Sequence, residues 1–196
     1  KVLPNAIDTE AARDAVATNW RGQLGIDAES PVIGYVGRLA HNKGVDVLLR
    51  AAAQVNQQHP ECHWLIVGDG AEKAQLQHIA ERAGLARKVH FVGNVPRDAV
   101  YGAMKGFDIA VVPSREEGFG LTALEAMACG VPLVASGVDA LREVVQDGET
   151  GVLFTPGDAD ALTVILMQLL AFQEQRQALA VAATRHAEAT YGRQAF

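Results

Sequence analysis

The feature that most constrains the fold is a regular alternation between short apolar runs and longer segments with helical spacing. The runs have a continuous apolar character, which is typical of parallel strands buried on both faces. They lie at residues 31–39, 63–69, 88–94, 107–114, 131–136 and 151–155. In the segment after the first run, Val45, Leu48 and Leu49 recur at helical spacing. The alternation predicts βαβ units and therefore an α/β protein with a single Rossmann-like, doubly wound parallel sheet.

The expected helices occupy the segments between these runs and the end of the chain. They are predicted at 43–58, 71–84, 96–105, from 121 onward, 140–146, 158–172 and 173–191. No internal repeat and no low-complexity linker interrupts the pattern. Residues 1–196 are therefore expected to form one domain.

Composition excludes several classes of function. Of 196 residues, 49% are hydrophobic and 20% are charged, which is ordinary for a globular protein with a buried core. The formal net charge of −6 argues against a nucleic-acid-binding protein, so any anionic ligand must meet a few local Arg or Lys side chains. Cys62 and Cys129 are too few for a disulfide framework and are expected as small packed residues or free thiols.

The chain shows no sign of a membrane span or of a signal segment. No run approaches the roughly 18 apolar residues that a span needs, and no basic-then-apolar segment opens the chain. A cytoplasmic location is expected. The chain starts with "KVLPNAIDTE", without an initiating methionine, and these residues are expected as strand or loop. We expect a fragment of a longer protein.

Ligands of such sheets bind beyond the carboxyl ends of the strands, so the strand-to-helix loops are the candidate sites. The first such loop carries Arg38 and Lys43 at the entrance to a helix, where backbone N–H groups and the helix dipole also favour an anion. Lys43 precedes Gly44, which is the wrong order for an ATPase P-loop. From the residues alone, two solvated surface cations remain an alternative.

Three other motifs favour structural explanations. The run Gly68-Asp69-Gly70 lacks the third glycine of a dinucleotide fingerprint and is expected to form a tight turn with a helix N-cap. The "DAD" run at 158–160 precedes an amphipathic helix, so we expect Asp158 to cap it and not to bind a metal. The six histidines show no metal-ligand spacing, and no metal site is predicted.

The stretch "EEGFGLTALE", residues 116–125, combines carboxylates with glycines that let the backbone approach a ligand. A helix is expected to begin near Leu121, and the free N–H groups of its first turn suit a phosphate or a sugar hydroxyl. Glu117 on the loop and Glu125 one turn into the helix can both face one cavity, where carboxylates accept hydrogen bonds from hydroxyls. The alternative is that Glu117 is a first-turn acid that pairs with the helix dipole and that Glu125 is a helix residue at the surface. Glu116 is expected at the surface.

Together these residues resemble the carboxyl-terminal, donor-binding domain of retaining glycosyltransferases with the GT-B architecture, the group 1 or family 4 type. The resemblance is carried by "GYVGRLAHNKGVDVLLRA", "LIVGDGAEKAQLQ", "EGFGLTALEAMACGVPLVAS" and "LREVVQDGETGVLFTPGD", and it covers nearly the whole chain. It implies that residues 1–196 bind a nucleotide-sugar donor. The amino-terminal acceptor domain is then absent from this chain. Acceptor glycan or lipid binding and any membrane contact would belong to that domain.

The resemblance also implies roles for individual residues. Arg38 and Lys43 would neutralise the donor diphosphate and the charge on the leaving nucleotide, so that neither a metal nor another cofactor is needed. Glu117 would bind the donor sugar, Glu125 would bind the ribose, and Arg38, Lys43 and Glu117 form the implied catalytic set. The other donor contacts implied are the turn at Val95 and Arg97, for the base, and the backbone of Gly118, Phe119, Gly120, Leu121 and Thr122.

Where many relatives carry a double glycine, this chain has Asp139 and Ala140, which leaves the identity of the sugar open. Two alternatives to a transferase remain at this stage. One is a nucleotide-sugar epimerase of the same architecture, and the other is a non-catalytic nucleotide-sugar binding module.

Overall fold

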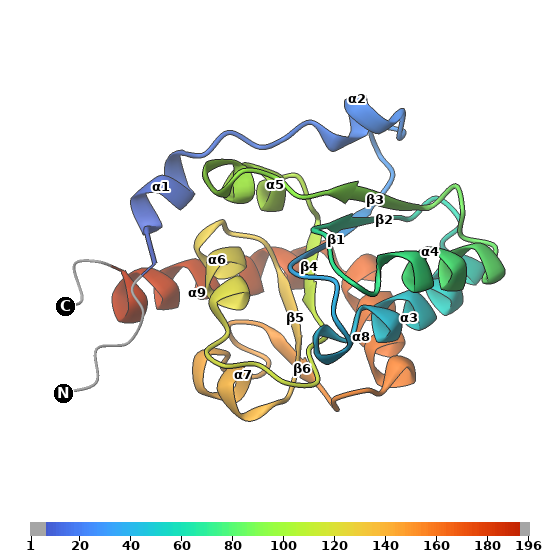
Figure 1. The fold of residues 1–196 in the computed structure, drawn as a ribbon. Helices are drawn as coiled ribbons and strands as arrows, with labels where there is room; N and C mark the ends of the chain where they lie inside the picture. Colours follow the sequence, from blue (N-terminus) through green and yellow to red (C-terminus); the bar gives the residue numbers. More distant parts are fainter. Residues whose placement is uncertain (1–6, 193–196) are drawn as a thin grey trace.

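Six parallel strands form one sheet at the centre of the molecule (Figure 1). The structure is a computed structural model that describes residues 7–192. The strands are β1 (Val32–Val36), β2 (His63–Val67), β3 (Val89–Gly93), β4 (Ile109–Val112), β5 (Leu133–Ser136) and β6 (Val152–Phe154). Their spatial order is β3-β2-β1-β4-β5-β6, which is the doubly wound order. The predicted fold class and all six predicted strands are confirmed.

Every expected helix is present, and two short ones precede β1. The α-helices are α1 (Thr9–Asp14), α2 (Trp20–Leu24), α3 (Val45–Gln58), α4 (Lys73–Arg82), α5 (Val100–Lys105), α6 (Leu121–Ala128), α7 (Asp139–Val144), α8 (Ala159–Ala171) and α9 (Gln173–Tyr191). Two 3₁₀ turns, η1 (His41–Lys43) and η2 (Arg97–Ala99), lie before α3 and α5.

The expectation of strand or loop at the start of the chain is wrong from Thr9 onward, and residues 1–6 lie outside the described part. Helices α1 and α2 have six and five residues, which is too short for a visible apolar period. Each is begun by a capping side chain. Asp8 accepts a hydrogen bond from the N–H of Ala11, and Asn19 accepts one from the N–H of Gly22.

Helices cover both faces of the sheet because successive strand residues point to opposite sides. In β2, Trp64 and Ile66 join the core beneath α3, α4 and α8, whereas Leu65 and Val67 join the core beneath α5, α6 and α9. Cys62 and Cys129 are buried free thiols, as predicted.

The winding direction reverses between β1 and β4. These strands are neighbours in the sheet, with Ile33 opposite Ile109, although they are far apart in sequence. The helix after β1, α3, packs on one face, and the helix after β4, α6, packs on the other. The loops that follow the two strands therefore lie side by side at the carboxyl edge of the sheet (Figure 1). The carboxyl edge of the sheet at such a switch point is the usual ligand site of these folds.

The two ends of the described chain also lie side by side. The N–H of Ile7 donates to the carbonyl of Tyr191, and Ile7 forms a parallel bridge with Gly192 (Figure 1). No helix within residues 7–192 is long and apolar enough to cross a bilayer.

Two expected helix caps have different outcomes. Asp158 caps α8 by accepting a hydrogen bond from the N–H of Ala161, as predicted. Asp69 does not cap α4. Its carboxylate instead accepts from the N–H of Gly70 and from Lys73 Nζ. Gly68 and Gly70 are needed because the chain there approaches the carbonyls of Gly37 and Leu39 closely.

Gly34, in the middle of β1, leaves room for an aromatic ring. A Cβ atom at Gly34 would lie 2.1 Å from Cδ2 of Phe107. We therefore predict that Gly34→Ala lowers the free energy of unfolding by about 1–3 kcal/mol, the usual cost of overpacking a core. Urea denaturation measures it. In a Phe107→Leu background the same substitution should cost less, and an equal cost in both backgrounds would contradict this explanation.

Candidate active site

The first pair of site residues comes from the two loops at the switch between β1 and β4. Lys43 ends η1, and Glu117 lies on the loop between β4 and α6. Lys43 Nζ lies 2.9 Å from Glu117 Oε2, and the side chains are only 21% and 14% exposed. Because the pair is largely shielded from water, the attraction is screened less than in a surface pair. The fold therefore unites two residues that are 74 positions apart.

The two oxygens of Glu117 have different surroundings. Oε2 accepts hydrogen bonds from Lys43 and from the hydroxyl of Ser114, at 3.1 Å. Oε1 has one long contact, at 3.3 Å, with the N–H of Gly118. Oε1 thus keeps most of its capacity to accept a hydrogen bond from a ligand hydroxyl.

Arg38 is an exposed cation on the same loop as Lys43. Among residues 7–192, no carboxylate pairs with its guanidinium. Its carbonyl accepts a hydrogen bond from the hydroxyl of buried Tyr35, at 2.9 Å, which fixes the turn that leads out of β1. Burial raises the pKa of Tyr35, and the nearby charge of Glu117 raises it further. Tyr35 therefore remains a neutral hydrogen-bond donor.

The amino terminus of α6 is open toward this edge of the sheet. Gly120 precedes the helix with φ +83, and no described side chain caps it. The first-turn N–H groups are thus available for an anion. Gly120 is required, because a Cβ atom there would lie 3.0 Å from Leu141 and 3.2 Å from Val144 of α7. The same contact places the Asp139-Ala140 run, at the start of α7, beside the open end of α6.

A cavity of about 390 Å³ lies beside α6. Three of the predicted residues line it: Arg97, Leu121 and Glu125. Five lining residues were not predicted, and they are Ile7, Asp8, Ala11, Asp98 and Tyr101. Tyr101 follows Arg97 by four positions, so helical spacing could have revealed it. The wall formed by α1 could not be foreseen, since α1 was not predicted.

Glu125 is half-buried in this cavity. Burial raises the pKa of its carboxyl group, and the charge of Arg97 partly offsets the effect. Ion pairs are found at Lys43–Glu117 and elsewhere, but none among residues 7–192 involves Glu125. An ionised Glu125 therefore costs free energy in the folded protein and is available to accept hydrogen bonds from a ligand.

The sequence of residues 16–186 matches a known family, described as glycosyl transferases group 1. The D-inositol 3-phosphate glycosyltransferase of Corynebacterium urealyticum is 38% identical over 176 residues, or 86% of this chain and 42% of that protein. The chain belongs to the group 1 glycosyltransferase family. It spans about half the length of the curated relatives it matches.

Solved GT-B glycosyltransferases share the fold of this group 1 glycosyltransferase chain. Sucrose-phosphate synthase from Thermosynechococcus elongatus has a TM-score of 0.89 and 31% identity, over 100% of this chain and 49% of that one. HepE from Anabaena, solved with UDP and glucose, has a TM-score of 0.88 and 29% identity, over 98% and 53%. The fold is therefore that of one half of a GT-B enzyme.

The remaining predicted residues of this glycosyltransferase chain lie around the same edge. The half-buried Val95 side chain packs against the core. The Phe119 ring contacts Tyr191 edge-on, with ring centroids 6.4 Å apart. Gly118 is exposed and Thr122 half-exposed, whereas Glu116 is exposed as predicted. No cluster of three or more His, Cys, Asp or Glu side chains that could hold a metal occurs within residues 7–192.

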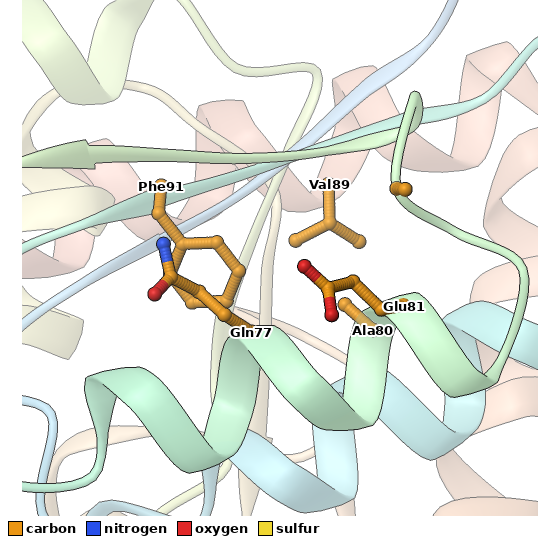
Figure 2. Close-up of a pocket in the computed structure, with 6 residues that line it drawn as sticks. Gln77, Ala80, Glu81, Val89 and Phe91 are labelled. Atoms are coloured by element: carbon orange, nitrogen blue, oxygen red, sulfur yellow. The ribbon is translucent and has the colours of Figure 1, made fainter.

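A second cavity, of about 190 Å³, shares no residue with this site. Figure 2 shows Val89 and Phe91 pointing from β3 toward α4, where Gln77 and Glu81 lie opposite. It lies at the β3 edge of the sheet, away from the switch between β1 and β4.

Glu125 gives a test of this site that needs no ligand. A carboxyl group with a higher pKa in the folded state than in the unfolded state destabilises the folded protein when it ionises. The protein therefore loses stability as the pH rises from the unfolded-state pKa through the folded-state pKa. Glu125→Gln keeps the shape of the protonated form. We predict that this variant is more stable than the parent at neutral pH and that its advantage disappears as the pH falls.

Thermal unfolding as a function of pH measures the difference. Glu116→Gln is the matched control, because Glu116 is an exposed carboxylate on the loop that precedes α6, and it should show no such trend. A constant difference between Glu125→Gln and the parent at all pH values would contradict the burial argument.

Proposed function

We propose that this chain is the donor-binding half of a retaining glycosyltransferase that transfers a hexose from a nucleotide-diphosphate sugar to an acceptor. The observation that carries the proposal is the meeting of Lys43 and Glu117 at the open end of α6, beside the cavity that holds Glu125. The N–H groups and cations that would bind the diphosphate would then lie between two carboxylates, Glu117 for the sugar and Glu125 for the ribose.

The nucleoside is proposed to occupy the cavity beside α6. Glu125 would accept hydrogen bonds from the two ribose hydroxyls, and these bonds would compensate the cost of ionising it there. The base would lie toward Arg97 and the backbone of Val95. Tyr101 adds a polar ring to the same wall.

The diphosphate is proposed to lie at the open end of α6. Backbone N–H groups of Gly120, Leu121 and Thr122 would donate to its oxygens, and the helix dipole would add to the attraction. Arg38 and Lys43 would supply the positive charges. Because these cations would neutralise the leaving nucleotide, we propose that no divalent metal is required.

Lys43 must change partners in this proposal. In the free protein its ammonium group is paired with Glu117. An incoming phosphate would draw Lys43 away and leave Glu117 Oε2 with only the Ser114 hydroxyl as a donor. Both oxygens of Glu117 could then accept hydrogen bonds from donor-sugar hydroxyls, with the backbone of Gly118 and Phe119 alongside.

The reaction proposed is substitution with retention at the anomeric carbon. The bond from this carbon to the β-phosphate oxygen breaks, and the bond to the acceptor oxygen forms on the same face of the sugar. The acceptor proton passes to the departing phosphate. Charge grows on the phosphate as the bond breaks, and fixed cations stabilise such a transition state more than the ground state.

The relatives support a nucleotide-sugar donor. HepE has been solved with UDP, with UDP and glucose, and with UDP-glucose. The acceptor would be a glycan or a lipid, bound by a second half that the relatives' greater length accommodates. This chain alone is proposed to bind nucleotide and to transfer no sugar. We place the protein in the cytoplasm, with any contact to a membrane made through that second half.

We predict that UDP, GDP or ADP binds to this chain in a calorimetric titration. Lys43→Ala should weaken binding by about 1.5–3 kcal/mol, the scale for hydrogen bonds to charged groups, and Glu125→Ala by a similar amount. The matched control is Lys88→Ala, since Lys88 contacts His63 at the amino end of β2 and is remote from the site. No heat with any of the three nucleotides, in a folded protein, would contradict the proposal.

A further inference from the structure

A second ion pair, between Arg115 and Asp46, joins the two loops that carry Lys43 and Glu117. Arg115 Nη1 and Nη2 each donate to one oxygen of Asp46, both at 2.7 Å. Arg115 Nη1 also donates to the carbonyl of His41 at 2.9 Å. Bidentate pairs of this kind fix orientation as well as distance. We call this pair and its contacts the Arg115–Asp46 clamp.

The main chain reinforces the same junction. The N–H groups of Arg115 and Glu116 both donate to the carbonyl of Asn42, at 2.8 and 3.2 Å. Gly44 has φ +65, and a Cβ atom there would lie 2.0 Å from the carbonyl oxygen of Pro113. The two loops are therefore in direct backbone contact, and Gly44 is the residue that permits it.

The residues of the clamp flank Lys43 in the sequence. Its two partners on the β1 side, His41 and Asp46, lie on either side of Lys43, and Arg115 lies two residues before Glu117. Rotating or sliding one loop past the other would change the Lys43–Glu117 separation directly.

The positive charge of Arg115 is already balanced by the carboxylate of Asp46. Burial alone would raise the pKa of Asp46, but hydrogen bonds from Arg115, with the charges of Arg115 and Arg50, hold it below the ordinary value. Asp46 is therefore ionised at neutral pH. An arginine held by two hydrogen bonds to a carboxylate is a poor free cation for a phosphate.

We propose that Arg115 and Asp46 are positioning residues that hold the loop of Lys43 beside the loop of Glu117 and so set the geometry of the donor site. This inference rests on the proposed function. The clamp residues act through Lys43 and do not themselves bind the donor.

The test is a double-mutant cycle with UDP as the first probe and GDP and ADP as the others. Arg115→Gln and Asp46→Asn should each weaken nucleotide binding about fivefold to tenfold, within the range of coupling between residues in one network. Arg115→Lys should restore part of the loss. In a Lys43→Ala background, Arg115→Gln should have almost no effect.

Arg50→Gln is the matched control. Arg50 lies 3.5 Å from Asp46 but is more than half exposed, and within residues 7–192 it makes no hydrogen bond or ion pair to the β4 loop. It should bind nucleotide as the parent does. Unfolding midpoints for all variants separate loss of positioning from loss of folding.

Three results would overturn the proposal. Equal weakening by Arg115→Gln with and without Lys43 would show that Arg115 acts independently of Lys43. Tighter binding by Asp46→Asn would show that a freed Arg115 itself binds phosphate. Unchanged nucleotide binding by both clamp variants would show that the clamp does not set the geometry of the donor site.

Failure of the proposed function would look different. In that case the parent itself would bind none of the three nucleotides. The clamp is then judged by hydrogen exchange in the free protein, where Arg115→Gln should speed exchange at the Glu116 amide about tenfold or more, as expected when a local junction opens. Unchanged exchange would overturn the clamp without reference to nucleotide.

Discussion

The pairing of β1 with β4 is the contact on which the rest of the molecule depends. It places Ile33 opposite Ile109 and brings two distant strand ends to one point. Because α3 and α6 leave that point on opposite faces of the sheet, the loops that begin them meet at its carboxyl edge. The Lys43–Glu117 pair, the Arg115–Asp46 clamp and the open end of α6 all depend on this pairing of β1 with β4. Gly34 serves the same pairing, since it leaves room for Phe107 where the chain enters β4.

Much of the fold could be predicted because the apolar runs are continuous and the helices are amphipathic. All six strands and the helices from α3 onward have the expected places. The exceptions are local. Helices α1 and α2 are too short to show a period, and their caps at Asp8 and Asn19 are the only strong signals. Asp69 does not cap α4 because the helix begins only at Lys73, with Glu72 at its N-cap position, and the Asp69 carboxylate pairs with Lys73.

The positions of the candidate residues could be predicted, but not their contacts. Arg38, Lys43 and Glu117 lie on the loops that follow β1 and β4, and Glu125 lies in α6. A pattern cannot reveal that Lys43 and Glu117 form an ion pair, because that depends on the junction made by Arg115, Asp46 and Gly44. It also could not reveal that α1 closes one side of the cavity. Those features arise only when segments far apart in sequence meet.

In the ligand-free protein, two residues of the site are held in arrangements that a ligand would make more favourable. Glu125 is held where ionisation is costly, and Lys43 is held by a carboxylate that it would have to leave. Both arrangements favour a ligand that supplies hydroxyl donors to Glu125 and negative charge to Lys43. A nucleotide sugar supplies both, on one molecule.

The most direct test is an NMR titration of the labelled chain with UDP that follows each backbone amide. The account predicts the largest shifts at Lys43, at residues 118–122 and at Glu125, with Arg97 and Tyr101 next. Shifts that centre instead on the cavity between α4 and β3, around Gln77 and Phe91, would contradict the placement of the donor site, as would unchanged amides at the start of α6 when the protein is saturated.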